Sequence, residues 1–177
     1  MASGVVHNTV TVASAATVGT FLLTVTTLSI NLIVWVVLGC LLGIYINPDL
    51  DMPTYTRVEN KLRKSRNPIV GFLGHIYIMF WFPYAWMIPH RAFLSHAPIV
   101  GTLFRLVYIL AFVTALVGLA SMLITVVPSN AVLIFWSYLT VSPPVIAAVA
   151  GLMISDFMHW VFDGSWWRKL SRITGVK

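Results

Sequence analysis

Two long windows of the sequence, residues 1–45 and 106–155, contain no Asp, Glu, Lys or Arg. Every formal charge lies in one of two stretches, 49–105 and 156–177. Because a helix that crosses a bilayer needs about 20 apolar residues, each window is long enough for two spans. Only 9% of the residues are charged, whereas roughly a quarter are charged in a soluble domain. The pattern therefore predicts an all-α integral membrane protein.

A polar patch inside each window predicts where the chain turns between two spans. The first patch is TTLSIN at 26–31, and the second is VPSN at 127–130, where Pro and Ser-Asn favour a turn. The four predicted spans cover residues 9–26, 30–46, 104–127 and 131–160. One tilted span over 14–46 is the alternative for the first window, and it would leave the N-terminus on the opposite side of the membrane.

Two such hairpins put both uncharged tips on one side of the membrane and all charged residues on the other. Since Lys and Arg in loops mark the cytoplasmic side, we expect the charged face, including Arg105, to face the cytoplasm. The membrane would be of the inner, plasma or thylakoid type. The same rule and contact with anionic membrane lipids account for the basic run 57–66, so the net charge of +6 does not predict nucleic-acid binding. The sequence identifies no protein partner.

Residues 68–87 are apolar and aromatic but contain His75 and Pro83. A fifth complete span here would separate the 49–66 loop from the residues after Pro89. An interfacial or re-entrant segment keeps them together, and its Trp and Tyr side chains suit the headgroup depth. We therefore expect one membrane-embedded domain over 1–177, with hairpins at 8–46 and 104–163, a basic loop and interfacial segment at 47–103, and a basic tail at 164–177.

Most of the acidic and histidine residues lie beside the predicted cytoplasmic ends of the spans. They are His7, Asp49, Asp51, His90, His96, Asp156, His159 and Asp163. In a helix, spacings of three and four residues place the last three on one face. Ionisable groups in membrane segments are costly and usually mark functional sites. Each pair taken alone is also typical of a polar turn, a helix cap or an orienting contact, and Ser95 is more typical of a turn than of a nucleophile.

Carboxylates and imidazoles without sulfur are ligands for Zn²⁺, Mn²⁺ or Fe²⁺. Up to eight candidates exceed the needs of one tetrahedral ion, so the sequence predicts a site for two divalent transition metal ions. Zinc is the first choice, and manganese and iron are the alternatives. The sequence contains neither H-E-x-x-H nor G-x-S-x-G, which excludes a zincin-type protease and a nucleophile elbow.

The motifs occur in a characteristic order: His7, P-D-x-D at 48–51, H-R-x-x-x-S-H at 90–96 and D-x-x-H-x-x-x-D at 156–163. This order resembles the DUF2227 group of metal-binding membrane proteins. That group is similar to the wider YdjM-like (LexA-binding, inner membrane-associated) superfamily of metal-dependent hydrolases. The likeness covers nearly the whole chain and is closest in SGVVHNTVT and HRAFLSHAPIVGTLFRLVY. It implies metal ligands at His7, Asp49, Asp51, His90, His96, His159 and Asp163, with Asp156 a ligand or a carboxylate that orients a histidine.

The expected function is a membrane-bound, metal-dependent hydrolase that acts at the cytoplasmic face. Its substrate would be a phosphoester or other ester that is amphiphilic or lipid-linked. Arg91 would bind a phosphate or carboxylate, and Asp156 or His90 would act as the general base. The alternative is a non-enzymatic membrane protein in which a structural metal site holds the hairpins together and the basic face docks a partner. A metal transporter is a third interpretation, but it needs polar residues along a path that the apolar windows lack.

Overall fold

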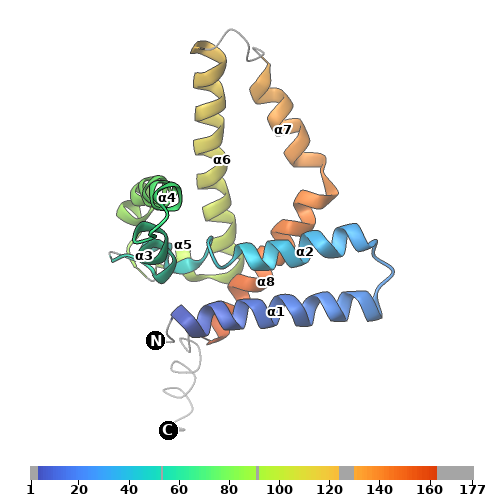
Figure 1. The fold of residues 1–177 in the computed structure, drawn as a ribbon. Helices are drawn as coiled ribbons and strands as arrows, with labels where there is room; N and C mark the ends of the chain where they lie inside the picture. Colours follow the sequence, from blue (N-terminus) through green and yellow to red (C-terminus); the bar gives the residue numbers. More distant parts are fainter. Residues whose placement is uncertain (1–3, 53, 91, 124–129, 163–177) are drawn as a thin grey trace.

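The computed structural model describes residues 4–52, 54–90, 92–123 and 130–162, and this part of the chain contains helices and no strand (Figure 1). The helices are α1 (Gly4–Val25), α2 (Ile30–Leu42), the 3₁₀ helix η1 (Pro48–Asp51), α3 (Arg57–Arg63), α4 (Pro68–Met87), α5 (Phe93–His96), α6 (Pro98–Leu123), α7 (Ala131–Val141) and α8 (Pro143–Phe162). Four of them, α1, α4, α6 and α8, are long and apolar enough to cross a membrane. The predicted all-α fold is confirmed.

The first hairpin, α1–α2, has arms of unequal length. Ser29 caps the start of α2 by accepting a hydrogen bond from the Leu32 amide at 3.4 Å, as a polar turn at 26–31 predicts. The 13 residues of α2 rise only about 20 Å, which is less than the roughly 30 Å of a bilayer core. The predicted span over 30–46 therefore ends early, at Leu42, and α2 by itself is too short to cross.

Close backbone contact explains how α2 packs against α8. A Cβ atom on Gly39 would lie 1.9 Å from the carbonyl oxygen of Ala148, and one on Gly151 would lie 2.0 Å from that of Val36. Only glycine leaves room for the two backbones to approach this closely, as is common between helices in membranes. The crossing fixes α8 beside the first hairpin and so places the end of α8 near the start of α1 (Figure 1).

The second hairpin contains a break that the sequence analysis did not predict. The expected span over 131–160 is instead two helices, α7 and α8, which are separated at Ser142. Pro143 and Pro144 have no backbone N–H and disfavour a helical residue before them, so α7 cannot continue through them. The 26-residue α6 is unbroken, and its later part extends beyond the other helices toward α7 in Figure 1.

Residues 68–87 form one uninterrupted helix, α4, in spite of Pro83. Figure 1 shows α4 nearly end-on, whereas α6 lies across the line of sight, so the two helices cross steeply. They meet through aromatic rings, with Trp81 stacked on Tyr108 at 5.6 Å between ring centroids. Because α4 and α6 are so steeply crossed, they cannot both follow the membrane normal. The interfacial or re-entrant location of α4 stays a prediction.

Candidate metal centre

The short helix η1 carries two of the predicted ligands, Asp49 and Asp51. Asn47 begins it by accepting a hydrogen bond from the Asp49 amide at 3.0 Å, while its own side-chain amide donates to the Ile44 carbonyl at 3.0 Å. Between the two acids, Leu50 is only 2% exposed and packs in an aromatic cluster with residues of α4. A capped start and a buried centre therefore hold both carboxylates in fixed positions.

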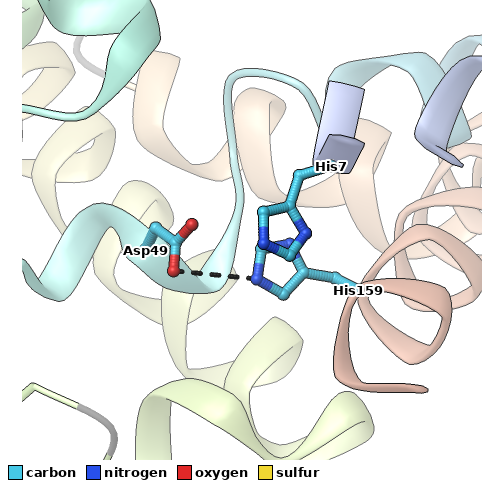
Figure 2. A group of neighbouring side chains, drawn as sticks. All are labelled: His7, Asp49 and His159. Atoms are coloured by element: carbon cyan, nitrogen blue, oxygen red, sulfur yellow. Dashed lines mark ion pairs between the residues drawn. The ribbon is translucent and has the colours of Figure 1, made fainter. Parts of the chain in front are cut away.

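The first group of candidate ligands consists of His7, Asp49 and His159 (Figure 2). His7 lies at the start of α1 and His159 near the end of α8, and their rings stack with centroids 3.9 Å apart and planes 10° from parallel. Asp49 Oδ1 is 3.7 Å from His159 Nε2. One ligand atom from each of the three residues lies within 4.8 Å of the others, which is close enough for one ion.

The second group consists of Asp51, His90 and His96. One ligand atom from each of them likewise lies within 4.8 Å of the others. His90 Nδ1 lies 2.7 Å from Asp51 Oδ1, and Ser95 Oγ donates to Asp51 Oδ2 at 2.5 Å. Ser95 Oγ is also 2.9 Å from His96 Nδ1. Asp51 is 1% exposed and Ser95 is fully buried, so the contacts are shielded from water.

These hydrogen bonds determine which ring nitrogens carry protons. A carboxylate only accepts, so His90 Nδ1 donates to Asp51. The Ser95 hydroxyl donates either to Asp51 or to the Ala92 carbonyl at 3.0 Å, so its oxygen accepts from His96 Nδ1. With the Nδ1 proton used in this way, Nε2 is the nitrogen through which each ring can bind a metal. A carboxylate that orients histidines in this way is common around metal sites.

Asp49 connects the two groups. Its Oδ1 lies 3.7 Å from His159 Nε2 and 3.9 Å from His96 Nε2. Both nitrogens are buried, and neither has a hydrogen-bond partner in the described part of the chain. Ligands of a tetrahedral ion with bonds of about 2.0–2.1 Å lie roughly 3.4 Å apart, so a cation would fit among these three atoms after a small adjustment. Unsatisfied imidazole nitrogens around one carboxylate oxygen are therefore well suited to a divalent metal.

The carboxylates of both groups are ionised at neutral pH. Burial by itself would raise the pKa of Asp49, but its interactions with His159, His7 and His96 outweigh this effect and lower it. For Asp51, burial is likewise outweighed by hydrogen bonds from His96, Ser95 and His90, and its pKa is also lowered. Ionised carboxylates are the form that binds metal.

Asp156 belongs to neither group. It is 1% exposed, and its Oδ2 accepts hydrogen bonds from Thr102 and from Arg105. Arg105 also donates to the Ser95 carbonyl at 2.8 Å and is fully buried, although the sequence analysis expected it on the cytoplasmic face. Sequence reasoning missed this ion pair, and its only signal was a single Arg at the margin of a charge-free window.

Two other predicted site residues, Arg91 and Asp163, lie outside the described residues, so their roles stay predictions. His75 lies apart from both groups and contacts the Gly71 carbonyl within α4 at 2.8 Å.

A small polar cavity of about 30 Å³ adjoins the first group. His7, Asp49 and His159 line it together with Asn8, Thr11 and Arg57. This volume is close to that of one water molecule. Sequence reasoning assigned Arg57 only to the basic run and did not predict its place beside the candidate ligands.

Comparison with known proteins identifies a family that this chain resembles. The sequence profile of a family described as uncharacterized metal-binding protein (DUF2227) matches residues 2–172. No curated protein and no solved structure matches the chain.

Proposed function

The chain belongs to the DUF2227 family of uncharacterized metal-binding proteins, and from this premise we propose that it is a membrane-bound, metal-dependent hydrolase. Its substrate would be an amphiphilic phosphoester or other ester, in line with the hydrolase superfamily that the motif order resembles. The observation that carries the proposal is the position of Asp49 Oδ1 between two buried imidazole nitrogens without hydrogen-bond partners. Asp49 and His159 also line the small cavity, which gives a reacting group access to the first group of ligands.

We assign one divalent ion to each group of ligands, with Asp49 between the two. His7, Asp49 and His159 would hold the first ion, and His96 and Asp49 the second, with Asp51 orienting the His90 and His96 rings. Nitrogen and oxygen donors without sulfur favour zinc, with manganese and iron as the alternatives. When bound, two such ions lower the pKa of a water and stabilise the charge that develops on an ester or phosphoryl oxygen.

Of the two residues expected to act as general base, His90 suits the role better. Its side chain is 25% exposed, and its Nδ1 is held by Asp51, so its Nε2 can accept a proton from water. Asp51 would orient the ring and stabilise the imidazolium that forms. Asp156, by contrast, is buried and bound to Arg105, which suits it to hold α6 and α8 together.

The proposal is tested with protein purified in detergent. Elemental analysis should find a transition metal in stoichiometric amount, and the loaded protein should hydrolyse at least one member of a panel of amphiphilic phosphoesters and carboxylic esters. Asp49→Asn should abolish both metal retention and hydrolysis. Protein that holds no stoichiometric metal would overturn the proposal.

One observation favours the alternative, a structural metal site. The candidate ligands come from α1, η1, α5, α8 and the segment before α5, so metal there would connect elements that are far apart in the sequence. His96→Ala distinguishes the two roles. A variant that stays folded in the membrane but loses hydrolysis supports catalysis, whereas loss of the protein from the membrane supports a structural role.

A further inference from the structure

We propose that Arg57 binds the phosphate group of the substrate at the open side of the metal centre. This inference rests on the proposed function and specifies its substrate class as a phosphoester. Arg57 lines the same cavity as His7, Asp49 and His159, and its side chain is exposed. A substrate group that enters from the solvent side can therefore contact both Arg57 and an ion held by the first group.

The backbone of Arg57 is held in a fixed position. Thr56, directly before it, caps α3: its Oγ accepts from the Glu59 amide at 3.3 Å, and Glu59 Oε2 accepts from the Thr56 amide at 2.6 Å. This reciprocal pair is a capping box, and it determines where α3 begins. Arg57 is the first residue of α3, so its Cα is fixed beside the cavity.

Arg57 makes no ion pair with an acid among the described residues. Glu59, the acid nearest to it in sequence, is 7% exposed and is already engaged in the capping box. Two other arginines do have partners, since Arg63 lies 4.3 Å above the ring of Tyr55 and Arg105 binds Asp156. The Arg57 guanidinium is thus available for an external anion, and its planar array of donors matches phosphate oxygens.

The cavity also limits what can enter. Its volume of about 30 Å³ accommodates one or two oxygen atoms and excludes a whole substrate. Most of the remaining lining, including Asn8 and Thr11, is polar and suits a hydrated or charged group. A phosphate would place its oxygens in the cavity and on Arg57, while the rest of the substrate stays outside.

The test measures binding of inorganic phosphate to the intact, zinc-loaded protein in detergent by isothermal titration calorimetry. Arg57→Gln should weaken binding by roughly tenfold or more, the cost of a charge-assisted hydrogen bond, and should leave the zinc content unchanged. Arg57→Lys should retain part of the affinity. The matched control is Arg66→Gln, which removes the same charge from an exposed position outside the cavity lining and should change the affinity by less than about twofold.

Equal phosphate affinities in Arg57→Gln and Arg66→Gln, at full zinc content, would overturn the inference and leave the hydrolase proposal standing. Absence of zinc from the wild type would instead overturn the hydrolase proposal.

Glycerol phosphate and bicelles of phosphatidylcholine with phosphatidic acid distinguish the source of the phosphate. Displacement of labelled phosphate from the wild type, but not from Arg57→Gln, by either competitor supports the inference. Displacement by neither contradicts it.

Discussion

At the residue scale, one oxygen atom of Asp49 lies between histidines that are 63 positions apart in the sequence, His96 and His159. Asp51, two residues away, has a different environment, because its two oxygens accept hydrogen bonds from His90 and Ser95. Two aspartates that are equivalent in the motif therefore have different contacts. Asp49 faces free imidazole nitrogens, whereas Asp51 fixes the tautomers of the rings.

This difference predicts the effect of Asp51→Asn. The amide can no longer accept from both His90 and Ser95 in the same way, so one ring loses its orientation. Loss of an orienting carboxylate typically lowers metal affinity by about 10–100-fold. We expect a decrease of this size in competition titrations of the purified protein with a zinc chelator.

His75→Gln is the control for that experiment, because His75 lies in α4 apart from both groups. It should leave the zinc affinity unchanged. An Asp51→Asn variant that binds zinc as tightly as the wild type would show that Asp51 has no orienting role.

At the element scale, glycine contacts and a buried ion pair determine how α8 reaches the metal centre. Gly39 and Gly151 let α2 and α8 pack backbone against backbone. Arg105 of α6 binds Asp156 of α8 and the carbonyl of Ser95 in α5. Because Asp156 and His159 are on the same helix and Ser95 contacts His96, this ion pair sets the position of one group of ligands relative to the other.

Gly39→Ala tests the packing of α2 against α8. The new Cβ would lie 1.9 Å from the Ala148 carbonyl oxygen, so the helices must separate. Overpacking of this kind usually costs about 1–3 kcal/mol. The melting temperature in detergent, followed by tryptophan fluorescence, should fall. Gly118→Ala is the matched control, since its Cβ would meet the nearest atom, Val132 Cγ2, at an ordinary 4.0 Å. If both variants melt at the same temperature, close packing at Gly39 is not what stabilises this contact.

At the scale of the whole molecule, α6 begins beside α5, which carries a candidate ligand, and extends away from α1, α2 and α5 (Figure 1). The 26 residues of α6 rise about 39 Å, enough to cross a bilayer core of roughly 30 Å. Large apolar side chains at the end of α6 are exposed, among them Met122 at 85% and Leu123 at 73%. Exposed apolar surface on the part of α6 that extends beyond the other helices suits contact with lipid.

Labelling of single cysteines tests the predicted orientation of the protein in the membrane. Cys40 is the single cysteine of the chain and is buried, so Cys40→Ser provides the background. In that background, Asn130→Cys near the hairpin tip should react with a membrane-impermeant maleimide in intact cells. Lys64→Cys, between α3 and α4, should react only after the cells are permeabilised, because the positive-inside rule predicts that the basic residues face the cytoplasm. Reaction of both positions in intact cells would contradict the predicted topology.

The sequence alone established the helical class, the apolar character of the long helices and the residues that could bind metal. These properties depend on local composition and on motif spacing, which can be read from neighbouring positions. Some element boundaries also depend on local sequence, such as the start of α2 after Ser29. The break before Pro143 was missed, although its cause, two consecutive prolines, is visible in the sequence. The early end of α2 was also missed.

Only the tertiary structure decided which polar groups meet. It separates the candidate ligands into two groups around Asp49, pairs Asp156 with Arg105, and places Arg57 beside the first group. No local pattern contains these pairings, because they depend on how α8 crosses the first hairpin and on where α6 begins. The physical reason is that burial makes each charged group require a partner, and the path of the backbone determines which partner is within reach.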